Sequence, residues 1–581
     1  MSSLEHQINL FKSNYLQRYM QSQNENEEHF DKMINDITDN IASLIDTKGI
    51  TLLNLVMSLK NDITSVDDES RQCSLDLLSI TLSKIKNDTL LNNECNVIFD
   101  FYLSKILNGN VDIYCFRQIL DGIYYILDFK HLAKSFPGIN HLLQFLVDEY
   151  NPNEFVAAIR YKIFAILDKF LNGGFVTDED LFINAFMNVA NGEKDPKNLM
   201  QSFNINKQIT TVFNKEILYS NSQKLFDLLF CYFPITFKPP KNDPYKISSD
   251  DLKKSLRNAL SNCDYFAIDC FPNLIDKLTA TSLIVKNETL NTLKECIANY
   301  SKESISNYWQ PIWDALKNEV LRNSVDESDE EYGVNNYKVS LEVIKELFSK
   351  LDNYVSEKFN FDETMLNFVF DDLKHNFETG KNLKQTSEIF AVLSSINLEL
   401  NGKILQLALP VLFEPIKSKK ELDMESHKLL LMNLAFFLKV VSEFNLSLPN
   451  ESPLFKFKDD ILILLTQNLT TTSDNEIHIK TLSIFQLTNL AKIKEFLAKD
   501  ELEMIAHVIR DTLNSPVSKN KNIFLACLDS IKVFVSYDNI DIVKEVILSS
   551  IFENLKTAES QELFDKNLKT AVDIVLASSK L

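Results

Sequence analysis

The stretch YFAIDCFPNLIDKL, Tyr265 to Leu278, decides the fold because its pattern returns in ISNYWQPIWDAL, Ile305 to Leu316. In both, a proline follows an apolar residue by six positions and precedes another by two, and the two prolines are 39 residues apart. A third copy, ILQLALPVLF, ends at Phe413. The residues in equivalent positions are Phe266, Pro272 and Leu274; Ile305, Pro311 and Trp313; and Ile404, Pro410 and Leu412.

The interval between the prolines is close to the ~40 to 47 residues of HEAT and armadillo repeats, which stack pairs of antiparallel helices. Apolar side chains also recur at helical spacing in many other stretches. Ten glycines in 581 residues suit helices better than hairpins, whose turns depend on glycine. We therefore predict an all-α fold, a HEAT/armadillo-like α-solenoid of stacked antiparallel helix pairs. Three sets of residues form the clearest stripes: Ile159, Ile163, Ile166 and Phe170; Leu290, Leu293, Ile297 and Tyr300; and Phe524, Leu528, Ile531 and Val535.

The composition excludes several classes of protein. A formal charge of -21 opposes direct nucleic-acid binding through a broad basic surface. The longest apolar runs, such as Leu429 to Leu438, are about half the ~20 residues that span a bilayer. The first twenty residues lack the unbroken apolar run of a secretory signal. We expect a cytosolic or nuclear protein with no membrane association.

Sequence motifs for catalysis are absent from the chain. It has no Walker phosphate loop and no G-x-G-x-x-G, H-E-x-x-H or G-x-S-x-G string. Cys263 and Cys270 are seven residues apart, whereas zinc and cluster sites place their ligands in closer pairs. We interpret these two cysteines as buried structural thiols and expect no enzyme activity, metal or cofactor. Trp309 and Trp313 are one helical turn apart, and we expect Trp313 to lie in the core.

A proline-rich stretch, CYFPITFKPPKNDPYKI from Cys231 to Ile247, interrupts the helical pattern. Proline cannot continue a helix and moves the preceding residue out of the helical region. We predict an extended loop that follows a helix ending near Phe230 and precedes one capped by Ser248 or Ser249. Phe233 and Phe237 are expected to anchor this loop on neighbouring repeats.

Two strings in this part of the chain resemble the Mms-nineteen type of nucleotide excision repair and transcription protein. In that family a Tyr-Phe-Pro-Ile-x-Phe-x-Pro-Pro-x-Asn-Asp-Pro string precedes an Asp-Leu helix start, and a Gly-Glu-Lys-Asp-Pro-x-Asn-Leu string comes before it. TLLNLVMSL, beginning at Thr51, adds weaker support. We predict a structural role for the matching residues: Gly192, Glu193, Lys194, Asp195, Pro196, Tyr232, Phe233, Pro234, Phe237, Pro239, Pro240, Asn242, Asp243 and Pro244.

The resemblance implies a non-catalytic adaptor of the cytosolic iron-sulfur protein assembly (CIA) targeting complex. Such an adaptor binds iron-sulfur apoproteins, among them DNA polymerases, primase and helicases, in cytoplasm and nucleus. It docks on a WD-repeat propeller protein and its small companion through a C-terminal HEAT block, to which we match no segment of this chain. A karyopherin-like HEAT transport receptor is the alternative, because composition and repeat length do not separate the two.

The predicted organisation has three parts. The family strings place an N-terminal HEAT-like block at 1–322, and further HEAT-like repeats are expected over 341–581. The acidic run DESDEE, Asp326 to Glu331, predicts an exposed loop at 323–340, because a run of like charges is unfavourable within packed helices.

Overall fold

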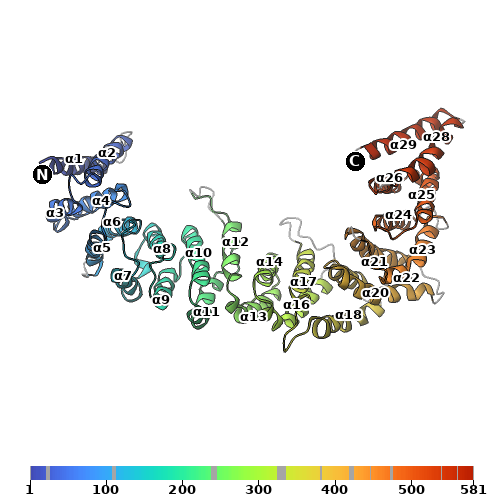
Figure 1. Cartoon of the computed structure of the whole chain (residues 1–581), viewed down its shortest axis with the longest axis horizontal. Helices are drawn as coiled ribbons and strands as arrows, with labels where there is room; N and C mark the ends of the chain where they lie inside the picture. Colours follow the sequence, from blue (N-terminus) through green and yellow to red (C-terminus); the bar gives the residue numbers. More distant parts are fainter. Residues whose placement is uncertain are drawn as a thin grey trace. The chain divides into compact units, whose positions relative to one another are not determined.

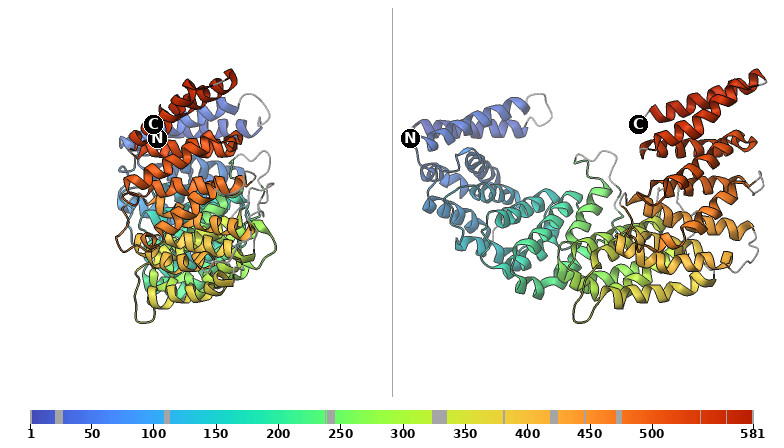
Figure 2. Two further views of the ribbon diagram at one scale, coloured as in Figure 1. Left: turned by 90° about the vertical axis from the view of Figure 1, so that its right-hand side faces the viewer. Right: turned by 45° about the vertical axis from the view of Figure 1, so that its right-hand side comes forward.

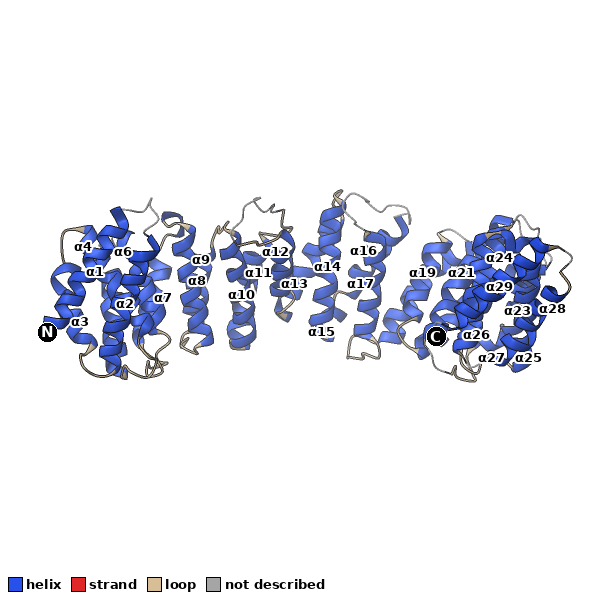
Figure 3. Ribbon diagram, turned by 90° about the horizontal axis from the view of Figure 1, so that it is seen from above, coloured by secondary structure: helices blue, strands red, loops and turns tan. Residues whose placement is uncertain are grey.

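The computed structural model describes residues 2–20, 27–107, 113–236, 238, 245–322, 335–379, 382–417, 424–444, 447–470, 476–537, 539–558 and 560–579. Over these ranges the regular elements are helices joined by loops (Figure 3). The one β-bridge recorded there joins Val355 and Asn360. The prediction of an all-α fold is therefore confirmed.

The chain divides into two compact units, unit 1 at Met1–Leu274 and unit 2 at Ile275–Leu581. The helices of unit 1 follow one another in chain order (Figure 1). They are α1 (Ser2–Met20), α2 (Glu27–Asp46), α3 (Leu52–Ile63), α4 (Asp68–Lys84), α5 (Asn92–Leu107), α6 (Ile113–Ile126), α7 (Pro137–Asp148), η1 (Pro152–Glu154), α8 (Ala157–Asn172), α9 (Glu179–Ala190), α10 (Pro196–Val212), α11 (Lys215–Phe230), α12 (Ser249–Leu260) and η2 (Asp264–Phe266); α13 (Ala267–Leu278) contains the division.

Unit 1 is built as two layers of helices. Each of α4, α6, α8 and α10 packs against the next but one helix along the chain, so that these four and α12 form one layer. In the same way α5, α7, α9 and α11 form the other layer. Figure 2 shows this stacking from two further sides, in blue to green. Stacked helix pairs of this kind are the HEAT-type arrangement that the repeat length predicts.

Unit 2 repeats the same plan. One layer contains α14, α17, α19, α21, α24, α26 and α29, each packed on the next in this order. Its elements are α14 (Leu283–Asn299), α15 (Lys302–Ser306), α16 (Trp309–Arg322), α17 (Asn336–Leu351), η3 (Phe361–Leu366), α18 (Asn367–Thr379), α19 (Leu383–Ser394), α20 (Leu398–Lys417), α21 (Met424–Glu443), α22 (Pro453–Lys456), α23 (Lys458–Thr470), α24 (Ile477–Lys492), α25 (Lys499–Asn514), η4 (Pro516–Lys519), α26 (Lys521–Ser536), α27 (Ile540–Ile542), η5 (Val543–Leu548), α28 (Ser549–Lys556) and α29 (Gln561–Ser579).

The proline-marked repeats have the predicted core positions. All six apolar residues that flank the three prolines are buried. Pro272 lies within α13 and Pro410 within α20. Pro311 is the third residue of α16, where a missing amide hydrogen leaves no helical bond unmade. It therefore belongs to the first turn of that helix.

The predicted stripes on Ile159 to Phe170 and on Leu290 to Tyr300 are buried throughout. The stripe on α26 is only partly right, because Phe524 and Val535 are half-buried while Ile523 and Phe534 lie in the core. The core face of α26 is thus rotated slightly from the predicted one. Trp313 is fully buried, as expected, and its indole Nε1 donates to Asp372 over 3.0 Å.

The predicted boundaries fare differently. Residues 323–334 of the acidic loop lie outside the described residues. Its last part is wrong, because α17 begins at Asn336 with Asn335 as its N-cap. An asparagine side chain that accepts an amide hydrogen of the first turn lets the helix start there. The division into blocks 1–322 and 341–581 rests on motif content, which packing units do not test, and it stays a prediction.

Candidate functional site

The first family string, Gly192 to Pro196, forms the turn between α9 and α10. Gly192 has φ +69°, a left-handed conformation that glycine adopts without strain. Asp195 is the N-cap of α10, and its carboxylate accepts the backbone amides of Lys197 and Asn198. Pro196 occupies the first helical position, where its fixed φ favours helix initiation. The string is therefore a helix-start motif.

Glu193 is the buried centre of this turn, with 3 % of its surface exposed. Arg160 of α8 donates to both of its carboxylate oxygens, over 2.8 and 2.7 Å. The backbone amides of Lys194 and Asp195 donate to Oε1, and Asn198 Nδ2 donates to Oε2. Both oxygens are thereby occupied, and none of these donors comes from outside the chain.

The electrostatics of Glu193 follow from this set of donors. Burial by itself raises the pKa of the Glu193 carboxyl, but the hydrogen bonds from Arg160, Asp195, Asn198 and Lys194 outweigh it and lower that pKa to about 2. The group is therefore ionised at neutral pH and has no proton to give. Its arrangement fixes α8 to the start of α10 and is unsuited to general acid or base chemistry.

The second family string meets the first through a tyrosine. Tyr232, just after α11, donates its hydroxyl hydrogen to the backbone carbonyl of Glu193 over 2.9 Å. Its ring packs edge-on against Phe203, with centroids 5.8 Å apart. The two strings, well apart in the sequence, are thus joined at one point, which we call the Glu193 node: Glu193, Arg160, Asn198, Asp195 and Tyr232.

The proline-rich loop begins as the sequence predicts. α11 ends at Phe230, and α12 has Ser248 as its N-cap, with Asp251 completing a capping box. Phe233 is buried, and its ring stacks on Phe230, 5.2 Å between centroids. Pro234 follows it half-buried. The other predicted residues of this string, Phe237, Pro239, Pro240, Asn242, Asp243 and Pro244, lie outside the described residues.

Arg160 is the member of the node that sequence reasoning missed. It precedes Glu193 by 33 residues, so no spacing rule connects the two. Asn198 lies in the matched Gly-Glu-Lys-Asp-Pro-x-Asn-Leu string and was open to discovery there. Lys194, by contrast, is exposed and contributes only its backbone amide to the node.

The thiols and carboxylates give no sign of a metal centre within the described ranges, where no group of three or more His, Cys, Asp or Glu side chains is arranged around a common point. Cys263 and Cys270 are buried, as predicted, and burial raises the pKa of Cys263 to about 11. Cys231 is exposed. Among the helices of the described residues, none combines the length and the apolar character needed to cross a lipid bilayer.

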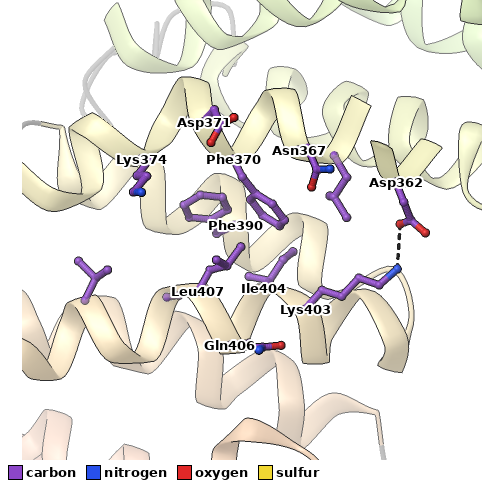
Figure 4. A pocket seen from close by; sticks show the side chains of 13 residues that line it. Asp362, Asn367, Phe370, Asp371, Lys374, Phe390, Lys403, Ile404, Gln406 and Leu407 are labelled. Carbon is purple, nitrogen blue, oxygen red and sulfur yellow. Dashed lines mark hydrogen bonds and ion pairs between the residues drawn. The ribbon is translucent and has the colours of Figure 1, made fainter. Parts of the chain in front are cut away.

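A groove with a volume of about 880 Å³ lies in unit 2, between α18 and α20 (Figure 4). Phe370 of α18, Phe390 of α19 and Leu407 of α20 form its apolar lining. At one end the Lys403 ammonium pairs with Asp362 over 2.8 Å and with Glu399 over 3.0 Å. At this end one ammonium thus faces two carboxylates, so Lys403 is not left without a carboxylate partner.

Comparison with known proteins identifies the relatives of this sequence. Residues 56–322 match the family model described as Dos2-interacting transcription regulator of RNA-Pol-II, MMS19_N. The chain is 36% identical over 555 residues to the Saccharomyces cerevisiae DNA repair/transcription protein MMS19, covering 90% of this chain and 52% of the relative. The resemblance to the MMS19 proteins is confirmed. It extends along most of the chain, well beyond the stretch that the family model matches.

More distant MMS19 proteins match over similar ranges. The Schizosaccharomyces pombe DNA repair/transcription protein mms19 is 26% identical and covers 84% of this chain and 47% of the relative. The human MMS19 nucleotide excision repair protein homolog is 24% identical and covers 81% of this chain and 45% of the relative. The chain thus spans about half the length of the MMS19 relatives it matches, which are named for DNA repair and transcription.

Solved structures of similar fold include those of the karyopherin Kap121p. Kap121p bound to Nup53p has a TM-score of 0.54 at 15% identity, and it covers 100% of this chain and 53% of that chain. A Kap121p mutant has a TM-score of 0.55 at 14% identity, with 98% and 52% covered. At such low identity the likeness shows the fold alone. The α-solenoid prediction is confirmed by it, and the transport-receptor alternative gains no functional support.

Proposed function

We propose that this chain is a non-catalytic adaptor in the CIA targeting pathway, which binds iron-sulfur apoproteins and presents them for cluster insertion. Its clients would be enzymes of DNA replication, repair and transcription such as polymerases, primase and helicases. Its docking partners would be the WD-repeat propeller protein and its small companion, in cytoplasm and nucleus. The observation that carries the proposal is the similarity to MMS19 proteins over 90% of the chain.

The architecture agrees with a binding role. Stacked helix pairs give an extended surface on which several partners find room. The Glu193 node, where the family strings meet, has all the carboxylate oxygens of Glu193 satisfied within the chain. The described residues of these strings therefore agree with a structural role, and clients are expected to bind elsewhere. The -21 charge favours clients with basic surfaces, because complementary charge speeds and orients association.

The decisive experiment has two readouts from the organism's own cells. Affinity purification of the tagged full chain should recover iron-sulfur apoproteins or assembly factors. Depletion of the chain should lower the iron bound to an iron-sulfur polymerase while its polypeptide is still made. Recovery of nucleoporins and a small GTPase in place of these proteins would replace the adaptor with a transport receptor.

Ionic strength tests the electrostatic part of the proposal. Surface charges are screened over a Debye length that shortens as salt is added. Raising the wash buffer from about 50 to about 300 mM salt should therefore release basic clients first. Client recovery that does not respond to salt contradicts charge-guided binding, although it leaves the adaptor role standing.

A further inference from the structure

An apolar groove in unit 1 has no role in the proposed function. It lies between α3 and α5 and has a volume of about 360 Å³. Leu53 and Val56 line one side, and Val97 and Phe101 line the other. Leu53 is 62% exposed and Val97 is 65% exposed. Adjoining the groove in sequence, Met57 and Leu91 are also more than half exposed. Grouped apolar exposure of this kind marks interaction surfaces.

Each wall of the groove has apolar side chains one helical turn apart. Leu53 and Met57 are one helical turn apart on α3, and Val97 and Phe101 are one turn apart on α5. Residues at this separation lie on one face of a helix and form a ridge. An amphipathic helix laid between two such ridges inserts its own apolar residues at i, i+3 or i+4 and i+7. The two ridges therefore offer apolar residues at the spacing that a helical ligand uses.

The charges beside the groove indicate what else that helix carries. Lys60 continues the exposed stripe of Leu53 and Met57 by one further turn. Lys105 lies beside the other wall, with Nζ 5.5 Å from the centroid of the Phe101 ring. Among the described residues, neither lysine has a carboxylate partner. The lining carboxylate, Glu94, accepts the backbone amide of Leu91 over 2.9 Å at the start of α5.

We propose that the α3–α5 groove binds an acidic amphipathic helix of a partner protein. The apolar face of that helix lies between the ridges of α3 and α5, and its carboxylates reach Lys60 and Lys105. Two cations that pair with no carboxylate of the described residues, in a chain of charge -21, make an acidic ligand the complementary one. The groove between α18 and α20 lacks this feature, since its Lys403 is already paired. The inference does not depend on the adaptor function.

The test uses the full 581-residue chain and fluorescence anisotropy with labelled synthetic peptides. The acidic probe is a helix of about 18 residues with leucine at i, i+4, i+7 and i+11 and glutamate on both flanks. The second probe replaces every glutamate with lysine, and the third scrambles the acidic sequence so that no apolar face forms. We expect the acidic probe to bind at least about tenfold more tightly than either of the others. Equal binding of the acidic and scrambled probes, or tighter binding of the basic one, overturns the proposal.

Variants then place the binding in this groove. Leu53→Ser combined with Val97→Ser should lower the affinity of the chain for the acidic probe by at least about tenfold. Val212→Ser is the matched control, because Val212 of α10 is equally exposed, at 63%. Lys60→Glu should lower the affinity for the acidic probe about threefold to tenfold and reduce the preference for it over the basic probe. Lys215→Glu, at an exposed lysine of α11, should change neither quantity. The assignment is overturned if the control variants lose affinity for the acidic probe, or if the groove variants keep it.

A second copy of the chain is the competing occupant. Sedimentation velocity of the wild-type chain and of the Leu53→Ser, Val97→Ser variant separates the two cases. We expect both proteins to sediment alike at all concentrations. Concentration-dependent self-association that the double substitution abolishes would assign the groove to the chain itself and overturn the acidic-helix proposal.

Discussion

The Glu193 node and the α3–α5 groove lie in the same unit, and each contains a string that the family resemblance singles out. At the node a charged side chain is buried and every oxygen of its carboxylate accepts a hydrogen bond. At the groove, apolar side chains are exposed to solvent, and Leu53 is 62% exposed. The node is explained by folding alone, since its partners all belong to the chain. Folding does not explain why the apolar side chains of the groove stay exposed. The node is therefore assigned to the scaffold, and the groove to the proposed binding surface.

Substitution of the node carboxylate should have the largest effect on stability. Glu193→Ala leaves Arg160 without its ion-pair partner in a mostly buried position, and breaking such a pair costs about 3 to 5 kcal/mol. Urea-induced unfolding of the chain measures this cost. Exposed Glu149→Ala is the control, expected to change the free energy of unfolding by less than about 0.5 kcal/mol. Equal effects of both substitutions contradict the structural weight given to the node.

The pH dependence of stability tests the same carboxylate without removing its volume. The pKa of Glu193 is lowered from 4.5 to about 2, so the ionised form stabilises the fold. That contribution is complete above about pH 5 and is lost as pH falls through 4.5 toward 2, about 3 kcal/mol in all. Glu193→Gln should therefore be less stable than wild type at pH 7, and the difference should stay constant down to about pH 5 and shrink as the pH falls further. A constant difference from pH 7 to pH 3 contradicts the lowered pKa.

Removal of the Tyr232 hydroxyl breaks the hydrogen bond between the two family strings and should lower stability less than the Glu193 substitutions do. Tyr232→Phe keeps the ring on Phe203 and loses only the hydrogen bond to the Glu193 carbonyl. We expect a loss of about 1 kcal/mol in the free energy of unfolding. Hydrogen exchange at the first turn of α10 should also become faster. Tyr219→Phe, at a tyrosine that is 71% exposed, serves as the control and should alter neither quantity.

Two glycines offer a test with opposite signs. Gly192 has φ +69° and Gly402 lies within α20 with no positive φ, and a Cβ atom at either position meets nothing within 4 Å. Gly192→Ala should destabilise by about 1 kcal/mol, because alanine disfavours that backbone conformation. Gly402→Ala should stabilise by about 0.5 to 1 kcal/mol, because alanine favours a helix interior. Thermal unfolding distinguishes the two shifts, and destabilisation of both variants contradicts this account of Gly192.

The sequence predicts the repeated architecture well because helix pairs bury apolar residues at regular spacing. Trp313 and the residues flanking the three prolines lie in the core as the pattern requires. The sequence predicts only part of the Glu193 node. Its turn and cap residues sit in a contiguous string, whereas Arg160 comes from the preceding repeat and becomes a partner only when α8 packs on α10.

The groove was hidden for a different reason. In TLLNLVMSL, Leu52, Leu55 and Leu59 are buried, while Leu53 and Met57 are exposed. An apolar residue at helical spacing looks the same in the sequence whether a neighbouring helix covers it or not. Only the packing of α3 on α4 shows which of its side chains are covered and which remain exposed. Exposed apolar surface of this kind follows from tertiary structure and not from periodicity.

The smallest expected effect on stability belongs to the groove, and it sharpens the comparison most. Leu53→Ser removes a side chain that is 62% exposed, so it forfeits little buried area and should change the free energy of unfolding by less than about 0.5 kcal/mol. Leu55→Ser, two residues along the same helix and fully buried, should cost several-fold more, about 3 kcal/mol. Urea-induced unfolding of the two variants makes the measurement. A cost for Leu53→Ser approaching that of Leu55→Ser would mean that Leu53 is packed in the folded chain, and the groove would then be part of the core and no docking surface.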